Sequence, residues 1–189
     1  MLEILKKIGQ FFLDLIETIV MALAIFVVCY LFLFQPHQVK GNSMYPNFYD
    51  GEYILTDKVS YRFGNPKRGD VVIFRSPQNK EVDYIKRIIG LPGERIEIKG
   101  GQVYINGEKL DESYLPAGTV TLPDMIRKIG PEDYFLMGDN RPDSSDSRIW
   151  GVCPKRDLIG KAAFIIWPFQ FFGKAEKQMT KSETRNPNK

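Results

Sequence analysis

An uncharged apolar run near the N-terminus limits what this chain can fold into more than any other feature. Residues Ile19–Phe34 contain no charge, and residues back to Phe11 are mostly apolar, interrupted by Asp14 and Glu17. A helix of about twenty residues crosses the roughly 30 Å hydrocarbon core of a bilayer. Lipid requires a single spanning segment to be helical even when it is rich in β-branched and aromatic residues. We therefore predict a transmembrane helix over residues 15–34.

A buried core helix and a cleavable signal peptide fit this run less well. A core helix normally shows a polar stripe, and none follows Thr18. Ala22-Leu23-Ala24 has the small-x-small pattern of a cleavage site, but ten apolar residues, Ile25–Phe34, still follow it. We predict an uncleaved signal anchor that remains part of the protein.

The basic residues around the span predict its orientation. Lys6 and Lys7 precede it, and basic residues favour the cytoplasmic side of a membrane. The expected organisation is a cytoplasmic N-terminus over residues 1–14, one span, and an extracytoplasmic domain over residues 35–173. Residues 174–189 are polar, charged and free of aromatic residues, which predicts a disordered tail.

Net charge and cysteine positions exclude several classes of protein. The formal net charge is only +3, and no Lys/Arg block of the kind that follows phosphates occurs, so nucleic-acid binding is not expected. Cys29 lies in the apolar run and Cys153 far downstream. We therefore expect no disulfide and no cysteine metal site, with both cysteines acting as small apolar fillers.

After Pro36 the pattern changes to short β-like stretches separated by turn residues. Gly100-Gly101 and Asn106-Gly107 are typical of hairpin turns. Strands at this spacing predict a mainly β domain, an antiparallel coiled sheet or barrel-like structure. The candidate strands, most of them rich in Val, Ile, Tyr and Phe, are Glu52–Ser60, Asp70–Arg75, Val82–Ile89, Arg95–Lys99, Gln102–Ile105, Asp133–Met137 and Lys161–Trp167.

The segment Trp167–Phe172 is unusually aromatic and has two interpretations. Exposed aromatic residues at this density favour the headgroup zone of a bilayer. The same residues could equally form an ordinary edge of the core. The sequence leaves both open.

Two segments carry residues suited to nucleophilic chemistry. Around Ser43, Gly41 permits an unusual backbone and Pro46 restricts the residue before it, so the turn can expose the serine hydroxyl. Lys86 and Arg87 interrupt a strand pattern, so one of them should point to the apolar face. A lysine commonly extends to the rim, but burial lowers a lysine pKa from about 10.4 by up to 3–5. A neutral lysine is a competent general base.

A third segment, residues 138–151, concentrates acids, bases and hydroxyls in one loop. Asp146 and Arg148 could form a buried pair there, and a serine hydroxyl could hold the lysine amine. A calcium site is the alternative, but calcium loops prefer alternating carboxylates closed by a glutamate, and this loop contains two arginines. We expect no metal.

The single histidine bears on which base the serine uses. A Ser-His-Asp triad would need His37, which follows Pro36 and lies six residues before Ser43. So short an extended segment does not easily fold back to present the imidazole to that serine. Ser–Lys chemistry, an accepted variant of the triad, remains.

In this order the segments resemble the bacterial type I signal peptidases, the Ser–Lys enzymes of the S26 serine protease family. That family combines a transmembrane anchor, a Ser-Met-x-Pro box, a Gly-Asp strand, a Lys-Arg box ending in Gly-x-Pro-Gly and a Gly-Asp-Asn-Arg box continuing to Ser-x-Asp-Ser-Arg. The resemblance extends from residue 15 to about 168, with boxes at Ser43–Pro46, Gly69–Phe74, Lys86–Glu94 and Gly138–Arg148.

The resemblance implies the activity and its setting. The chain would be a single-pass serine endopeptidase of the cell membrane that removes signal peptides from exported preproteins. It would cut after small residues at positions −1 and −3 through an acyl-enzyme, without a cofactor. Its partners would be the signal peptide and the lipid bilayer, and the protein would be a monomer or weakly associated. The implied fold is a mostly antiparallel β domain.

The resemblance also implies residue roles. Ser43 would be the nucleophile, with its N–H donating to the oxyanion, and Lys86 the general base. Ser144 matches the serine that hydrogen-bonds the lysine, Asp146 the acid that braces the site and Arg148 its ion-pair partner, with Asp139 also supporting. The substrate would add as a strand between two edges, over shallow pockets formed by Gln38, Val39, Met44, Tyr84 and Ile85.

Two positions depart from the family pattern. Gly41 stands where some members have a serine whose hydroxyl completes the oxyanion hole, and losing such a donor can cost about 10²–10³ in rate. Pro142-Asp143 replaces the usual Asp-Asn beside Ser144. Lys86, which is histidine in the eukaryotic branch, favours the bacterial type, and the single span is similar to Gram-positive or cyanobacterial members.

Two other functions fit this sequence less well. A self-cleaving protease of the repressor type shares the Ser–Lys dyad, but it predicts a DNA-binding or regulatory N-terminal domain and a scissile Ala-Gly or Cys-Gly. A membrane-tethered binding module predicts a missing Ser43 or Lys86, and both are present. The span supports the peptidase. Ser43 lies nine residues beyond Phe34, hence at most roughly 30 Å from the membrane surface.

Overall fold

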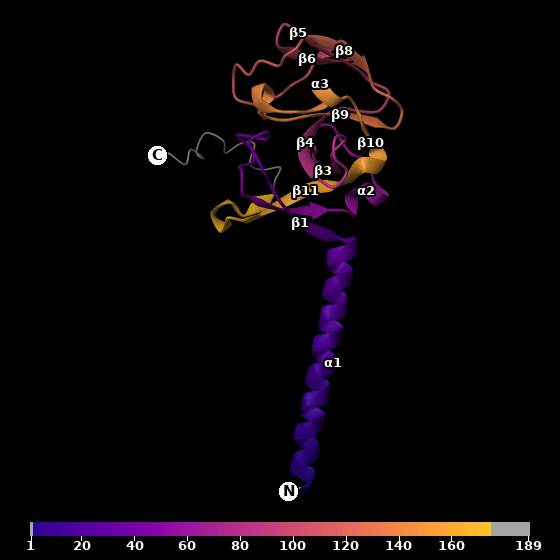
Figure 1. Ribbon diagram of the computed structural model, residues 1–189, viewed down its shortest axis with the longest axis vertical. Helices are drawn as coiled ribbons and strands as arrows, with labels where there is room; N and C mark the ends of the chain where they lie inside the picture. Colours follow the sequence, from indigo (N-terminus) through magenta and orange to yellow (C-terminus); the bar gives the residue numbers. More distant parts are fainter. Residues whose placement is uncertain (1, 175–189) are drawn as a thin grey trace.

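The computed structural model describes residues 2–174, and the predicted tail lies largely outside them. A helix, α1 (Leu2–Phe32), projects from a β domain and meets it only at its C-terminal end (Figure 1). Residues Leu2–Tyr30 are long and apolar enough to cross a membrane. Most described side chains of α1 are exposed, so the protein itself does not shield them from solvent.

The observed helix differs from the predicted span at both ends. It begins at Leu2 instead of residue 15, because helical hydrogen bonds propagate at little cost once a helix has formed. It ends at Phe32, and the chain enters a strand at Phe34. The α1 C-terminus also contacts the domain, where the Arg62 guanidinium lies 5.9 Å from the centre of the Phe32 ring.

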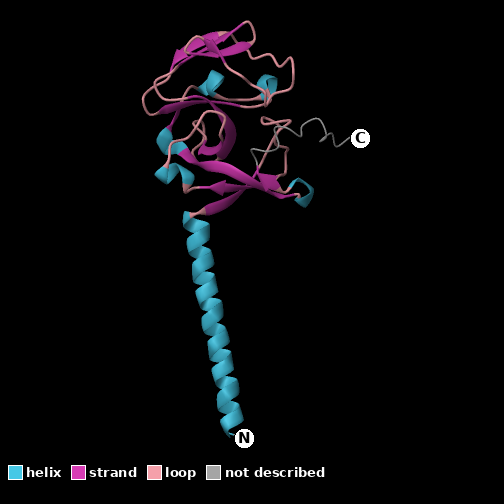
Figure 2. Ribbon diagram, turned by 180° about the vertical axis from the view of Figure 1, so that it is seen from behind, coloured by secondary structure: helices cyan, strands magenta, loops and turns pink. Residues whose placement is uncertain are grey.

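The larger sheet is antiparallel throughout and strongly curled (Figure 2). Its path is β1-β2-β11-β3-β4-β9-β10, and β12 pairs with β11. Four successive antiparallel pairings separate β1 from β4, so these two strands run in the same direction. The strands are β1 (Phe34–Gln38), β2 (Tyr53–Asp57), β3 (Val71–Arg75), β4 (Asp83–Gly90), β9 (Asp133–Met137), β10 (Cys153–Pro154), β11 (Leu158–Trp167) and β12 (Gly173–Lys174).

A second antiparallel sheet lies at the end of the domain farthest from α1 (Figure 1). Its order is β7-β6-β5-β8, with β5 (Arg95–Lys99), β6 (Gln102–Ile105), β7 (Glu108–Lys109) and β8 (Met125–Lys128). Gly100-Gly101 and Asn106-Gly107 form its hairpin turns, and all four residues have positive φ. The short helices are α2 (Ser60–Phe63), α3 (Ser147–Trp150), η1 (Arg141–Asp143), η2 (Lys155–Asp157) and η3 (Phe169–Phe171).

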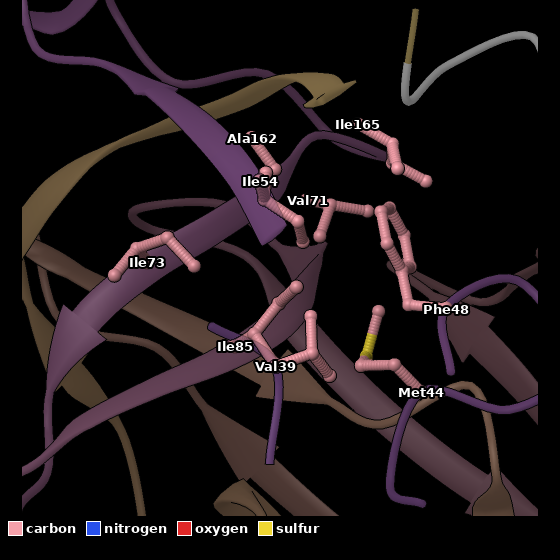
Figure 3. Packing of buried hydrophobic residues seen from close by; sticks show 9 residues of the cluster. All are labelled: Val39, Met44, Phe48, Ile54, Val71, Ile73, Ile85, Ala162 and Ile165. Atoms are coloured by element: carbon pink, nitrogen blue, oxygen red, sulfur yellow. The ribbon is translucent and has the colours of Figure 1, made fainter. Parts of the chain in front are cut away.

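The hydrophobic cluster shown in Figure 3 supports the region around Ser43. Met44 and Phe48 come from the loop that follows β1, and they pack against residues of β2, β3, β4 and β11. Fully burying side chains of this size contributes roughly 1.5–3 kcal/mol each. The full cluster is Val39, Met44, Phe48, Ile54, Val71, Ile73, Ile85, Ala162 and Ile165.

The mainly β, antiparallel fold confirms the sequence prediction. All seven candidate strands are present within a few residues, whereas β1, β8 and the two-residue strands β7, β10 and β12 were missed. The sequence of β1 contains Pro36, which normally argues against a strand. Its position at the edge of the sheet explains the exception, because an edge strand leaves some N–H groups unpaired.

In the aromatic segment at the end of β11, some side chains are exposed and one packs on the core. Trp167, Phe169 and Phe172 are 50%, 72% and 67% exposed, whereas Phe171 packs against the core cluster and stacks on Tyr49. The segment lies at the level of β1, at the end of the domain from which α1 leaves (Figure 1). Three of these four side chains therefore face the surroundings on the side of the anchor.

Candidate active site

Ser43 lies in a loop that closes tightly between β1 and β2. At the base of the loop, the Val39 N–H donates to the Glu52 carbonyl oxygen at 2.7 Å, and the Gly51 N–H donates to the Val39 carbonyl at 2.9 Å. Buried Met44 anchors the loop from below. The Asn140 N–H donates to the Ser43 carbonyl at 3.0 Å. The loop is thus fixed by hydrogen bonds at its base, by the packing of Met44 in the core and by a hydrogen bond to the loop after β9. The Ser43 side chain stays half-buried.

Lys86 on β4 is brought directly to this serine. Its Nζ lies 2.6 Å from Ser43 Oγ and donates to the Ile85 carbonyl oxygen at 2.9 Å. The side chain is buried, with 4% of the residue exposed. Burial lowers the pKa of Lys86 from 10.5 to about 8, while the nearby carboxylates of Asp146 and Asp139 oppose this shift. An appreciable fraction of the amine is therefore neutral near neutral pH and able to accept the serine proton.

Arg87, the next residue on β4, points to the opposite face and is also buried. Its Nε donates to Asp139 Oδ1 at 2.7 Å and one terminal nitrogen donates to Asp139 Oδ2 at 2.6 Å, with both side chains 0% exposed. The Asn47 amide donates to the same Asp139 oxygen at 2.8 Å. The sequence predicted that one of Lys86 and Arg87 points to the apolar face; in the structure both are buried, because β4 is covered on both faces.

Asp146 and Arg148 form a second buried pair. Arg148 donates from Nε to Asp146 Oδ1 at 2.8 Å and from a terminal nitrogen to Oδ2 at 2.7 Å, and Asp146 also accepts the Gly138 N–H at 3.0 Å. The bond from Gly138, the residue after β9, ties the polar loop to the end of that strand. The pair matches the sequence prediction.

A groove of about 490 Å³ leads away from Ser43 and Lys86. One wall is the chain from His37 to Lys40, and the other is the chain from Glu81 to Lys86, with Ile54 and Ile73 among the remaining lining residues. Of the predicted substrate contacts, Gln38, Val39, Tyr84 and Ile85 line it. Met44 is fully buried in the core cluster beside Val39 and Ile85.

Known proteins share this sequence over most of its length. The chain matches the family of signal peptidases, peptidase S26, over residues 12–167. It is 35% identical over 179 residues to signal peptidase IB of Staphylococcus aureus, with 84% of this chain and 93% of the relative covered. It is 39% identical over 155 residues to signal peptidase I of Bacillus caldolyticus, with 75% of this chain and 84% of the relative covered.

The chain belongs to the signal peptidase family, peptidase S26. It is therefore a hydrolase and a serine endopeptidase of the signal peptidase I type, from a membrane-associated family. A crystal structure of a signal peptidase I from Enterococcus faecalis is 33% identical, with a TM-score of 0.47 over 51% of this chain and 96% of that one.

Ser144 differs from what the resemblance to signal peptidases implied. Its hydroxyl is buried, yet within residues 2–174 it has no hydrogen-bond partner, so the expected bond to Lys86 is not formed in this structure. The hydroxyl nevertheless lies at the site. A Cβ added at Gly138 would collide with both Ser144 Oγ and the Ser43 carbonyl oxygen. Gly138 thus allows the two serine segments to approach.

The two departures from the signal peptidase pattern also have structural explanations. Gly41 has φ +81°, in the left-handed region where a serine would be strained, and its N–H donates to Asp50 Oδ1 at 2.7 Å. Pro142 lies near the start of η1, and both it and Asp143 are exposed. Pro142-Asp143 therefore forms a surface turn and does not enter the site.

Several site residues had no signal in the sequence. Asn47 follows the serine box by one residue, but its contact with Asp139 joins positions 92 residues apart. His37 and Asp83 meet across the groove, Nε2 to Oδ2 at 3.3 Å. In the sequence, His37 was a candidate only for the base of a triad. Hydrophobic patterning can place such residues on strands but cannot say which strands face one another.

Proposed function

We propose that this signal peptidase cuts exported preproteins with Ser43 as nucleophile and Lys86 as general base. The observation that carries the proposal is the 2.6 Å contact between Lys86 Nζ and Ser43 Oγ, made by a lysine that is 4% exposed. A lysine has little reason to be buried beside a hydroxyl for stability alone, because burial disfavours its charged form.

The chemistry follows from this pair. Ser43 Oγ attacks the carbonyl carbon of the scissile bond while its proton passes to Lys86 Nζ. The negative charge that develops on the carbonyl oxygen is stabilised by the Ser43 N–H. The C–N bond then breaks, Lys86 returns the proton to the leaving amine, and the signal peptide remains as an ester on Ser43. Water gives a proton to Lys86 and attacks this ester, and Ser43 regains its proton as the acid leaves.

The groove supports a substrate bound as an added strand. Val39 uses both its N–H and its C=O on the β2 side, so the preceding residue Gln38, the last of β1, points its backbone groups the other way, toward the groove. Beyond Lys86, β4 pairs with β9 only from Arg87 onward, so the preceding residues keep a free edge. A peptide between these edges gains main-chain hydrogen bonds from both walls.

The floor of the groove accounts for small residues at −1 and −3. Side chains of an added strand alternate between two faces, so positions −1 and −3 both point at the floor. That floor includes close-packed Val39, Ile54, Ile73 and Ile85, which belong to the core. Shallow depressions over a packed core accept small side chains, because a large one would have to displace core residues.

The test is cleavage of a preprotein with an Ala-x-Ala site by the full chain in detergent. Wild type should cut after the second alanine, and Ser43→Ala and Lys86→Ala should lose at least about 10³ in kcat. Ser113→Ala, between β7 and β8, and Lys99→Ala, on β5, change exposed residues that do not line the groove. These matched controls should keep full activity. Cleavage by Ser43→Ala would overturn the nucleophile assignment, and a silent wild type would overturn the proposed function.

We further propose that α1 anchors the chain with the β domain outside the cytoplasm and its aromatic end at the bilayer surface. This rests on the exposed apolar surface of α1 and on exposed Trp167, Phe169 and Phe172, which lie at the level of β1, at the end of the domain from which α1 leaves. In the Trp150→Phe variant, Trp167 is the remaining tryptophan. Its fluorescence in reconstituted vesicles should be quenched by bromine-labelled lipid.

Two results would contradict this arrangement. Trp167 emission that is indifferent to brominated lipid would remove the aromatic contact with the bilayer. External protease added to intact protoplasts should digest residues 35–173. A domain that survives until the cells are lysed would reverse the orientation.

A further inference from the structure

A second polar contact crosses the groove at the end away from the Ser43–Lys86 pair. His37 Nε2 on one wall lies 3.3 Å from Asp83 Oδ2 on the other. The inference drawn from this contact rests on the proposed function, because it concerns the substrate strand that would lie between these walls.

The two walls run in register with each other. Strands β1 and β4 have the same direction, and His37 precedes Val39 by two residues just as Asp83 precedes Ile85 by two. Residues two apart on a strand share a face. Val39 and Ile85 both belong to the core cluster beneath the groove. His37 and Asp83 therefore face the floor of the groove as well, two residues farther along each wall.

An added substrate strand has the same two-residue period. When its residue −1 lies over Val39 and Ile85, beside Ser43, its residue −3 lies two residues farther along, at His37 and Asp83. Position −3 therefore meets a polar pair, whereas position −1 meets two apolar side chains. The two subsites differ in chemistry even though both are small.

One ring nitrogen of His37 has a hydrogen-bond partner, and the other is directed at Asp83 on the floor of the groove. Its Nδ1 lies 2.8 Å from the buried Thr56 hydroxyl, whereas Nε2 is buried and, among the described residues, forms no well-aligned hydrogen bond. Burial lowers the pKa of His37, although Asp83 opposes this, so the ring is mostly neutral near pH 7 and carries one N–H. The adjacent carboxylate favours placing that hydrogen on Nε2, with Nδ1 accepting from Thr56.

We propose that the His37–Asp83 pair makes this enzyme prefer a hydroxyl side chain, serine or threonine, three residues before the cut. Such a hydroxyl can accept a hydrogen bond from His37 Nε2 and donate one to Asp83. An alanine or valine offers neither bond, yet it covers part of the same two groups. Buried polar groups left without partners are what allow a site to reject an analogue lacking the hydroxyl.

The preference should be moderate because the pair is only partly shielded. The His37 side chain is 13% exposed and that of Asp83 is 33% exposed, so water can still reach the carboxylate. A fully enclosed site discriminates by about 10⁴–10⁵, whereas we expect about tenfold here, the size of one net hydrogen bond to a charged group.

The experiment is a competition between two peptides in one reaction with the full chain in detergent. The peptides carry Thr-x-Ala and Val-x-Ala sites, which are nearly isosteric and differ in the hydroxyl. The ratio of the two cleavage rates gives the ratio of kcat/KM and does not depend on how much enzyme is active. Wild type should favour threonine about tenfold. A ratio near one, or a preference for valine, would overturn the inference.

Variants assign the preference to the pair. His37→Leu and Asp83→Leu should each bring the ratio to about one or below, whereas Glu108→Gln, an exposed carboxylate on β7, should keep the wild-type ratio. A ratio unchanged in both leucine variants would also overturn the inference. If His37→Leu fails to fold, Asp83→Leu on the more exposed wall still decides the question.

Failure of this inference is distinct from failure of the proposed function. An enzyme that cuts both peptides after alanine without preference retains the Ser43–Lys86 activity and loses only the role of the pair. An enzyme that cuts neither peptide, nor a preprotein, contradicts the proposed function on which the inference rests.

Discussion

Replacing Lys86 with methionine should abolish cleavage and, at neutral pH, stabilise the folded domain. The lowered pKa of Lys86, from 10.5 to about 8, means that the charged amine is less stable in the fold than in the unfolded chain. At about 1.4 kcal/mol per pH unit, this amounts to about 3 kcal/mol at pH 7. Methionine fills a similar volume without a charge, so this cost disappears.

Two lost hydrogen bonds offset part of the gain. Lys86 donates to the Ile85 carbonyl and contacts the Ser43 hydroxyl, and each contributes about 1 kcal/mol. The net stabilisation by Lys86→Met at pH 7 should therefore be about 1 kcal/mol. The pH dependence of the difference is more informative, because the hydrogen-bond loss is nearly constant with pH.

The sign of that dependence follows from proton binding. Between about pH 8 and pH 10.5 the unfolded chain keeps the Lys86 proton while the folded protein has lost it, so wild-type stability rises with pH in this window. The methionine variant lacks this contribution. Its stability relative to wild type should fall by about 2.5 kcal/mol from pH 7 to pH 10.

The assay is urea unfolding of the full chain in detergent, followed by tryptophan fluorescence at several pH values. Lys99→Met removes an exposed lysine and should follow the wild-type pH curve. A difference between wild type and Lys86→Met that stays constant from pH 7 to pH 10 would show that the lysine pKa is not lowered. The wild-type kcat/KM should also rise with pH to a midpoint of about 8, the pKa of the base in the free enzyme.

Three further predictions concern residues around the candidate site. Asp139→Ala leaves the Arg87 charge buried without its carboxylate and should lower the free energy of unfolding in urea by about 3–5 kcal/mol. The control Glu97→Ala breaks a partly exposed ion pair and should lower it by at most about 1 kcal/mol. Equal losses in the two variants would contradict the burial argument. Gly41→Ser should lower the free energy of unfolding by about 1–2 kcal/mol, because a serine is strained at this positive φ, and it should not raise kcat. A faster enzyme would show that the new hydroxyl reaches the oxyanion despite the strained backbone. Ser144→Ala should leave the free energy of unfolding unchanged or raise it, because the hydroxyl has no hydrogen-bond partner within residues 2–174. A clear loss of stability in the same assay would show that the hydroxyl does have a partner.

Much of the fold was predictable because its signals are local. Alternating apolar residues and Gly or Asn turns located seven strands and two hairpins, since side chains on a strand repeat every two residues. The strand β1 was missed for an equally local reason. Its Pro36 argues against a strand, and only the knowledge that β1 lies at a sheet edge reverses that conclusion.

The members of the candidate site were marked by the resemblance to signal peptidases, and their contacts were less predictable. The structure places Lys86 beside Ser43 and pairs Asp146 with Arg148. The predicted bond from Ser144 to Lys86 was not found. The Arg87–Asp139 pair was not foreseen either, because it joins residues 52 positions apart through the pairing of β4 with β9.

The sequence by itself determined that this chain has an apolar segment able to span a membrane and the strand pattern of an antiparallel β domain. Both follow from composition and short-range pattern, which the chain carries before it folds, whereas Ser43 and Lys86 were marked by the resemblance to signal peptidases. Only the tertiary structure decided that the amine lies 2.6 Å from the hydroxyl, that both neighbours on β4 are buried and that His37 faces Asp83 across the groove. Each of these depends on which distant strands pair and in what register, and that is settled by packing of the whole core.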